Sequence, residues 1–308
     1  MRWVIIGGPT ASGKSSLALD LAGRFRGEII NADSRQVYRH LDIGTAKPSA
    51  EDRRRIPHHL FDVADPTERF DAARYRDLAR PLVREVASRG KLPIVVGGTG
   101  LYIRALARGL FAAPPARTTL RAALSRLEER APGTLARWNR RLDPSLSARV
   151  HANDRVRLLR ALEVMLITGE AMSAQQRRHG FGDRFGEFLY LIVDPGAETL
   201  KQFIRQRSMR LFASGLVEEV RSLWARGYSP DLPAMRSIGY REAGRMLSGE
   251  WSEEQALEAL VRATERFAKR QRTWFRAESA ATWVDPRNDT DLIVDRVRRF
   301  FVPRAPAL

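Results

Sequence analysis

The sequence predicts an α/β fold: a P-loop-type parallel sheet core with helices on both faces, and an inserted all-helical subdomain. Short apolar runs end in small or acidic residues, as buried parallel strands do. Helical patterns separate these runs, which gives the strand-helix-strand order of a parallel sheet. One long stretch, residues 112–186, shows helical patterns alone. We therefore assign residues 1–111 and 187–308 to the core and residues 112–186 to the subdomain.

Five apolar runs are the expected strands, in chain order "WVIIGG", "GEIINADS", "HHLFDV", "LPIVVGG" and "FLYLIVD". After the first run, Leu17, Leu21 and Phe25 recur at i, i+4 and i+8, which predicts a helix. The run "RYRDLARPLVREVASRG" predicts another helix that ends at Gly90. In the subdomain, "TTLRAALSRLEER" and "DRVRLLRALEVMLITG" are helical, and after "FLYLIVD" we expect helices alone to about Phe301.

Composition indicates an intracellular globular protein. The chain has 308 residues and 44% hydrophobic content, enough for a sizeable core. Cysteine is absent, which excludes disulfides and thiolate metal sites. No apolar run approaches the ~20 residues of a membrane span, and "MRWVIIGGP" is too short for a signal peptide. We expect a cytoplasmic protein without a membrane partner, and a monomer because no coiled-coil heptad stands out.

The charge of the chain favours a polyanionic partner. It has 53 basic and 36 acidic residues, a formal net charge of +17. Residues 112–186 hold fourteen arginines against seven carboxylates. Such an excess favours nucleic acid over a small neutral solute, although an arginine-rich proteome from a GC-rich genome is an alternative. Only five basic residues are lysines, and one of them, Lys14, falls in a glycine-rich loop where a compact ammonium is suitable.

Residues 8–15, "GPTASGKS", fit the phosphate-binding pattern G-x-x-x-x-G-K-[ST] between a strand and a helix. Glycines let successive N–H groups turn inward, and the helix N-terminus adds partial positive charge. Lys14 can reach terminal phosphate oxygens, and the Ser15 hydroxyl can ligate Mg²⁺. The pattern is typical of nucleotide-binding enzymes such as ATP-binding kinases, but it indicates a polyphosphate and not a reaction. The predicted phosphate-binding residues are Gly8, Pro9, Thr10, Ala11, Ser12, Gly13, Lys14 and Ser15.

Three acids at strand ends are candidates for catalysis. Asp33 ends the second strand at the carboxyl edge of the sheet, beside the phosphate loop, where such folds bind ligands. It could act as a general base or a metal ligand. Asp62 and Asp194 are more typical of turns or helix caps. His58 and His59 are adjacent and point to opposite sides of a strand, so packing or hydrogen bonding is favoured over metal binding.

Residues 262–276, "RATERFAKRQRTWFR", form a basic helical pattern. A solvated surface helix is one interpretation. Like charges at i, i+4 repel each other, however, and a phosphate backbone would relieve that repulsion, so the pattern favours nucleic acid binding. One arc of the helical wheel holds Arg262, Arg266, Lys269, Arg270, Arg272 and Arg276, and the opposite arc holds Ala263, Phe267, Gln271, Trp274 and Phe275.

The motifs together resemble the tRNA dimethylallyltransferase family, also called tRNA isopentenyltransferases, from Gly8 to Arg276. The strings that carry the resemblance are "GPTASGKS", "INADSRQVYRHLDIGTAKP", "PHHLFDVADP", "GGTGLYIRAL", "HANDRVRLLRALEV", "MRSIGYRE" and "FAKRQRTWFR". The family transfers a dimethylallyl group from dimethylallyl diphosphate to the exocyclic amine of the adenosine 3′ of the anticodon. The resemblance therefore implies an enzyme of this activity.

The resemblance also implies roles for the residues above. The loop would hold the donor's diphosphate as a leaving group, with Mg²⁺ at Ser15. Asp33 matches the residue that hydrogen-bonds the attacking amine and accepts its proton. Arg207 matches by position an arginine that the family uses on the diphosphate, although Arg205 and Arg210 lie nearby. The implied catalytic residues are Asp33, Arg207, Lys14 and Thr10.

The partner that the resemblance implies is tRNA, bound through its anticodon stem-loop. The subdomain would hold the stem, and the target base would be extruded from the loop and stacked on side chains. The implied tRNA contacts are Asp33, Ser34, Arg35, Gln36, Thr99, Arg121, Val156, Arg157, Leu158, Leu159, Arg160, Arg236, Ser237, Ile238, Gly239, Tyr240, Arg241, Lys269, Arg270, Gln271, Arg272, Thr273, Trp274, Phe275 and Arg276.

Three other functions share part of this pattern. A small-molecule kinase would use the loop for ATP and Asp33 as base to a hydroxyl, but would not need the basic helices. An adenylate isopentenyltransferase would share the donor site and could dispense with much of the RNA-binding surface. An RNA-binding protein without activity would explain the charge but not a phosphate loop beside Asp33.

Overall fold

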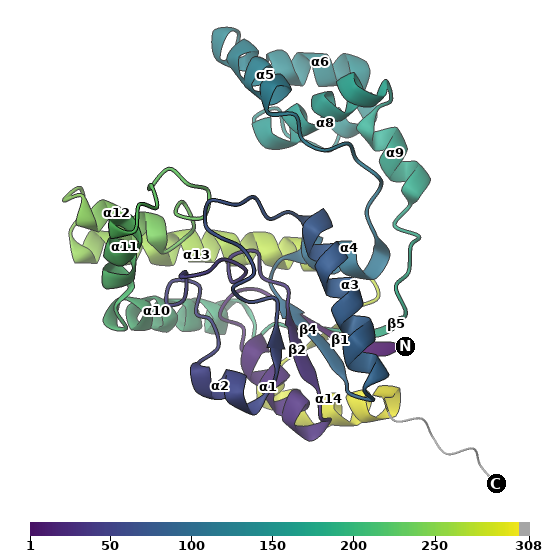
Figure 1. Cartoon of the computed structure of the whole chain (residues 1–308), viewed down its shortest axis with the longest axis vertical. Helices are drawn as coiled ribbons and strands as arrows, with labels where there is room; N and C mark the ends of the chain where they lie inside the picture. Colours follow the sequence, from purple (N-terminus) through teal and green to yellow (C-terminus); the bar gives the residue numbers. More distant parts are fainter. Residues whose placement is uncertain (302–308) are drawn as a thin grey trace. The chain divides into compact units, whose positions relative to one another are not determined.

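A single parallel sheet is the centre of the fold. The computed structural model describes residues 1–301, and residues 302–308 lie outside the described residues. All neighbouring strands are parallel, in the order β3-β2-β4-β1-β5-β6. Figure 1 labels the four middle strands of this order, β2, β4, β1 and β5. In the central strand, Ile5 pairs with Val95 on one side and with Tyr190 on the other. The strands are β1 (Arg2–Gly7), β2 (Glu28–Asn31), β3 (His58–His59), β4 (Pro93–Gly97), β5 (Glu187–Val193) and β6 (Thr282–Val284).

The predicted fold class is confirmed, with one correction. All five expected strands are present, although the run "HHLFDV" supplies only the two residues of β3. The expectation of helices alone after "FLYLIVD" was wrong, because β6 adds a sixth strand beside β5. Three residues at a sheet edge are too few to show an apolar period, so the sequence pattern gave no sign of this strand.

Helices cover both faces of the sheet. Val4 and Ile6 pack in one buried cluster with Leu17 and Leu21 of α1 and Ile293 of α14. The alternate residues of β1 point to the other face, where α3 packs. The helices of this part are α1 (Lys14–Arg24), α2 (Ala50–Arg55), α3 (Ala72–Ser88), α4 (Gly100–Arg108), α10 (Ala197–Ala213), α11 (Leu216–Ala225), α12 (Tyr240–Leu247), α13 (Glu253–Arg276) and α14 (Pro286–Phe301).

The chain divides into two compact units. We call Met1–Ala107 together with the chain from Phe185 the core unit, and Arg108–Arg184 the helical unit. The helical unit has its own buried cluster, which includes Leu124, Leu135 and Leu162. Its helices are α5 (Thr118–Arg130), α6 (Thr134–Leu142), α7 (Pro144–Ser147), α8 (Arg155–Thr168) and α9 (Met172–His179).

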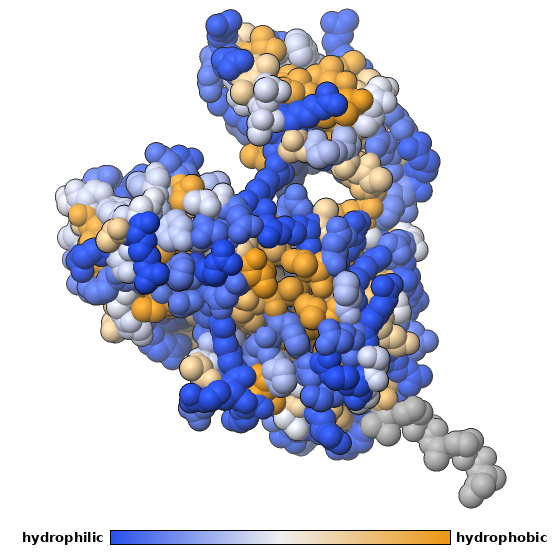
Figure 2. Space-filling model, viewed as in Figure 1, coloured by the Kyte–Doolittle hydropathy of each residue, from blue (hydrophilic) through white to orange (hydrophobic). Residues whose placement is uncertain are grey.

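The surface is rich in hydrophilic side chains. Figure 2 shows them over most of the viewed face, with an apolar area where Figure 1 shows β2 and β4. Within residues 1–301, no helix is both long enough and apolar enough to cross a membrane.

Candidate active site

The phosphate loop lies between the end of β1 and the start of α1. Gly13 precedes the helix with φ +89°, and Ala11 also has a left-handed backbone, with φ +63°. Successive residues of this kind turn backbone N–H groups toward one concave site, which suits an anion. The first turn of α1 contains no acidic residue, so the positive end of the helix dipole is not neutralised there.

Two cations face this loop. Lys14 is 9% exposed, and its Nζ donates a hydrogen bond to the carbonyl oxygen of Pro9 at 3.1 Å. Burial lowers the pKa of Lys14 to about 8, against the raising effect of Asp33. Arg207 of α10 is half-buried and donates to the carbonyl oxygen of Thr45 at 3.4 Å. Loss of solvation lowers its pKa as well, while Asp33 raises it. An anionic ligand would stabilise both charges.

The structure also separates Arg207 from the two arginines near it. Arg205 points elsewhere, to an ion pair with Glu258 at 2.9 Å. Arg210 lines a further cavity beside the phosphate loop, which Arg207 also lines. Only Arg207 lies in both cavities that are described below. Of the three arginines, Arg207 is therefore the one that adjoins both sides of the site.

Asp33 is held by its neighbours at the carboxyl edge of the sheet. The buried side chain of Asn31 accepts from the Asp33 N–H at 2.9 Å and donates to its carbonyl oxygen at 3.2 Å. Oδ1 of Asp33 accepts from the Arg35 N–H at 2.8 Å, and Thr99 Oγ1 accepts from the Ser34 N–H at 2.9 Å. The carboxylate is thus fixed in position by groups that were themselves ordered by folding.

Two cavities meet at Asp33. The first, of about 390 Å³, contains the phosphate-loop side of the site, with Lys14 and Ser15. The second, of about 270 Å³, opens toward α13 and the segment before α12, with Arg236, Phe267 and Arg270. Four residues line both cavities, namely Thr10, Asp33, Thr45 and Arg207. Molecules bound in the two cavities would therefore both reach these four residues.

The remaining acids and histidines have structural partners. Asp62 accepts from Lys47 and Arg53 at 2.5 and 2.7 Å, and these hydrogen bonds outweigh burial and lower its pKa. Asp194 pairs with Arg272 at 2.8 Å. Both imidazoles make hydrogen bonds, as predicted: His58 with the Ile56 carbonyl and His59 with Glu28, each at 2.7 Å.

The basic helix is α13, and its exposed arc differs in one member from the predicted one. Arg262, Arg266, Lys269, Arg270 and Arg276 are exposed. Arg272 is not on this arc, because its side chain turns back to Asp194 and is 23% exposed. The helical wheel could not show this pairing, since the partner lies at the end of β5.

Several residues of the implied tRNA set are interior. Leu158, Ser237, Gly239, Tyr240, Gln271 and Phe275 are all buried. Because these residues are buried, they have little surface with which to contact RNA. They support the residues around them instead. The exposed members are Arg35, Val156, Arg157, Arg236, Arg241, Lys269, Arg270, Thr273 and Arg276, and those of intermediate exposure are Asp33, Ser34, Gln36, Thr99, Arg121, Leu159, Arg160, Ile238, Arg272 and Trp274.

In the helical unit, Arg121 and Arg160 are brought together by a buried acid. Both donate to Glu163, whose side chain is fully buried, at 2.7 and 2.5 Å. The Arg117 N–H adds a third hydrogen bond at 2.7 Å. Although burial alone would raise it, these donors lower the pKa of Glu163 to about 2. The hydrogen bonds of Glu163 join α5 to α8 and hold Arg121 and Arg160 side by side.

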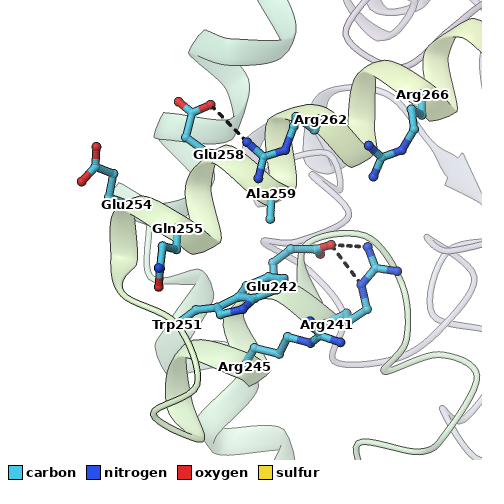
Figure 3. A pocket seen from close by; sticks show the side chains of 10 residues that line it. All are labelled: Arg241, Glu242, Arg245, Trp251, Glu254, Gln255, Glu258, Ala259, Arg262 and Arg266. Carbon is cyan, nitrogen blue, oxygen red and sulfur yellow. Dashed lines mark hydrogen bonds and ion pairs between the residues drawn. The ribbon is translucent and has the colours of Figure 1, made fainter.

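Another basic cavity, of about 640 Å³, lies between α12 and α13. Four arginines line it, Arg241, Arg245, Arg262 and Arg266 (Figure 3). Arg245 stacks on the ring of Trp251 with 4.5 Å between guanidinium and ring centroid. Glutamates 242, 254 and 258 share the lining, and no part of the phosphate loop reaches it. This cavity is therefore not a candidate for the chemistry.

Sequence reasoning missed some supporting residues of the site. Asn31 and Thr45 carry no catalytic signal in the sequence, because both side chains only support the backbone. Asn31 bonds backbone groups of Asp33 and Leu60, and Thr45 Oγ1 donates to the Leu41 carbonyl oxygen. Lys47 is 2% exposed and donates to Asp42, Asp62 and the Tyr38 carbonyl, which ties down the segment that includes Thr45. In the sequence, the string "DIGTAKP" indicates a function only through the family resemblance.

A phosphate loop at the carboxyl edge of a parallel sheet, faced by a lysine, an arginine and a fixed carboxylate, defines an enzyme of the P-loop class. Comparisons with known proteins specify it further. A family model described as IPP transferase matches residues 36–278. The tRNA dimethylallyltransferases of Geobacter metallireducens and Geobacter sulfurreducens are each 49% identical to this chain, over 97% of it and 97% of their own lengths. The chain belongs to the IPP transferase family and is a transferase.

Solved structures agree with this assignment. The full-length tRNA isopentenylpyrophosphate transferase from Bacillus halodurans is 35% identical, with a TM-score of 0.69 over 97% of this chain and 95% of its own. A eukaryotic dimethylallyltransferase acting on tRNA is 26% identical, with a TM-score of 0.81 over 96% of this chain and 77% of its own.

Proposed function

We propose that this enzyme transfers a dimethylallyl group from dimethylallyl diphosphate to the exocyclic amine of the adenosine 3′ of the anticodon in tRNA, and releases diphosphate. The observation that carries the proposal is the position of Asp33, which lines both the phosphate-loop cavity and the basic cavity beside α13. The first cavity suits an allylic diphosphate, because its lining combines Lys14 and Arg207 with the apolar side chains of Ile29 and Phe61.

The chemistry assigns separate tasks to the two sides of Asp33. The bond between the allylic carbon and the diphosphate oxygen breaks, and the adenine amine forms a bond to that carbon. Negative charge grows on the leaving diphosphate, where Lys14, Arg207 and the loop N–H groups would stabilise it. The amine is a weak nucleophile because its lone pair is delocalised into the ring. Asp33 would accept its proton as the new bond forms.

A magnesium ion fits the loop only with help from the substrate. Ser15 is exposed, lies in the first turn of α1 and lines the phosphate-loop cavity. Within residues 1–301, no group of three or more histidines and acids could hold a metal by itself. Mg²⁺ commonly takes one protein oxygen together with phosphate oxygens and water. We propose that Ser15 holds it in this way, where it would neutralise charge on the diphosphate.

The acceptor would bind along the exposed cations of the second cavity. Arg236 and Arg270 line that cavity, and Lys269 and Arg276 lie exposed on the same helix as Arg270. Phe267 provides an aromatic face in the cavity, on which an extruded base could stack. In the helical unit, Arg157 and the paired Arg121 and Arg160 would contact the anticodon stem. These contacts would be mainly to phosphates, and would position the tRNA.

The test follows labelled dimethylallyl diphosphate, with Mg²⁺, into three acceptors: unmodified tRNA with adenosine 3′ of the anticodon, the same tRNA with guanosine there, and AMP. The proposal predicts label in the first acceptor alone. Label in both tRNAs would refute the assigned position, and label in AMP would assign the enzyme to the free-nucleotide branch. Label in none would favour a kinase, which transfer from labelled ATP to a small-molecule hydroxyl would then reveal.

A further inference from the structure

Gln271 lies in the C-terminal part of the basic helix α13, among its exposed cations, yet its side chain faces the phosphate loop. It is 6% exposed. Its Oε1 accepts a hydrogen bond from the backbone N–H of Thr10 at 2.8 Å, and its Nε2 donates to the carbonyl oxygen of Gly98 at 2.9 Å. Both ends of the amide are therefore engaged by backbone groups. Little of this side chain is left to contact RNA, in contrast with its exposed neighbours Lys269 and Arg270.

Two glycines after β4 allow α13 to come this close. A Cβ atom at Gly98 would lie 2.2 Å from Nε2 of Gln271, and one at Gly100 would lie 2.0 Å from Nε1 of Trp274. Both distances are far below van der Waals contact, so any larger residue would displace the side chain from α13. The "GGTG" string thus has a packing reason that is independent of any ligand.

The same loop reaches Asp33 from the other side. The Thr99 N–H donates to the carbonyl oxygen of Ala32 at 3.2 Å, and Thr99 Oγ1 accepts from the Ser34 N–H at 2.9 Å. Hydrogen bonds therefore connect Thr10 to Gln271 and Gln271 to Gly98. The next residue, Thr99, bonds the residues on either side of Asp33. The two halves of the candidate active site are joined through one glutamine.

We propose that Gln271 is a positioning residue of the donor site, which fixes the phosphate loop at the distance from Asp33 that transfer requires. The inference rests on the proposed function, because it takes the loop to be the diphosphate site. Gln271 acts through Thr10, because its Oε1 accepts the hydrogen bond of the Thr10 N–H. Thr10 lines both cavities of the site. Helix α13 then serves both substrates: exposed cations for the acceptor, and a buried amide for the donor loop.

The first variant is Gln271→Met, which keeps the length of the side chain and removes both hydrogen bonds. The part-buried Thr10 N–H and the buried Gly98 carbonyl oxygen would be left without these partners, so the loop would shift or loosen. Titration calorimetry with inorganic diphosphate and Mg²⁺ should show affinity reduced about tenfold, the scale of one buried unsatisfied group. The KM for the allylic donor should rise and kcat should fall. The dissociation constant for tRNA should stay within about twofold of the wild-type value, as expected for a residue that does not touch RNA.

The second variant, Gly98→Ala, disturbs the same contact from the opposite side and leaves Gln271 in the chain. It should reproduce the loss of diphosphate affinity, and the double variant should lose little more than either single variant, because both changes break one interaction. Should Gln271→Met melt far below the wild type, Gly98→Ala decides the question. Arg270→Ala on the same helix is the matched contrast, and it should weaken tRNA binding while diphosphate binding persists.

Two results would overturn the inference: Gln271→Met weakens tRNA binding with diphosphate affinity unchanged, or it changes neither affinity. The first would make Gln271 a reader of RNA, and the second would make it a packing residue only. A wild-type protein that binds no diphosphate at all would be a different failure, because it would refute the proposed function on which the inference rests.

Discussion

Asp33 and Arg207 line the same two cavities, although Asp33 follows a strand near the start of the chain and Arg207 lies on α10. Their charges influence each other, since Asp33 raises the pKa of the arginine that desolvation lowers. In the proposed reaction, the base for the amine and a cation for the leaving diphosphate would thus be neighbours in one site. This relationship is what distinguishes a group-transfer site from a simple phosphate-binding loop.

The low pKa of Lys14 predicts how diphosphate binding depends on pH. In the free protein burial lowers this pKa to about 8, whereas a bound anion would raise it. Above pH 8, binding must therefore take up a proton, and affinity should fall by about tenfold per pH unit. Calorimetric titrations with diphosphate at several pH values test this. The same titrations with Lys14→Met report only the protonation of the diphosphate itself. If the affinity of this variant falls as steeply above pH 8, Lys14 is not the group that titrates.

Reversal of one charge on α13 should change how tRNA binding responds to salt. Arg270 is exposed, lines the second cavity and lies 5.7 Å from the centroid of the Phe267 ring. In Arg270→Glu we expect weaker binding and a salt slope smaller by about one, the loss of one phosphate contact. Filter binding over a range of salt concentrations measures the slope.

A matched control is Arg298→Glu, an exposed arginine of α14. Figure 1 shows α14 well apart from α13. This substitution alters the net charge of the protein by the same amount and should leave the slope unchanged. Equal slopes for all three proteins would mean that α13 does not approach the RNA backbone.

Glu163 should be essential to the stability of the helical unit. Its fully buried carboxylate pairs with Arg121 and Arg160. Glu163→Gln leaves two arginines without a counter-charge and should destabilise this unit by about 3 kcal/mol. Hydrogen exchange of the α8 amides in the full chain reports that change. Glu129→Gln, on the exposed side of α5, is the neutral control, and identical exchange in both variants would show that the buried pair contributes nothing.

The same carboxylate gives the unit a defined response to acid. Its pKa in the folded state, about 2, lies below the ordinary value of 4.5. The unfolded state therefore binds the proton more readily, and the contribution of Glu163 is complete above pH 4.5 and lost as the pH falls toward 2. In Glu163→Gln the exchange rates of α8 should lose this part of their pH dependence. A persistent acid transition of the same size would assign it to other groups.

Much of the fold and part of the site could be predicted from sequence because their signals are local. Buried parallel strands are continuous apolar runs, so β1, β2, β4 and β5 were evident. The phosphate loop is a contiguous motif, and Asp33 could be predicted because it closely follows the strand β2 beside that loop. The edge strand β6 has no such period, and three residues cannot show one.

The rest of the site depends on contacts between distant segments. The helical wheel placed Gln271 on the inner arc of α13, but not against Thr10 and Gly98. It placed Arg272 among the outer cations, whereas the end of β5 supplies a carboxylate that draws this side chain inward. Such pairings arise from the packing of α13 on the sheet edge, which no periodic pattern encodes.

The central claim is that Asp33 joins a donor site to an acceptor site. Single-turnover transfer from labelled dimethylallyl diphosphate to unmodified tRNA, by the wild type and by Asp33→Asn, tests it most directly, with the affinities for diphosphate and tRNA measured in parallel. The account predicts that the wild type transfers the label, and that the variant is slower by about 10²-fold or more because the general base is lost, while both affinities stay within a few-fold. A variant with the full wild-type rate would contradict it.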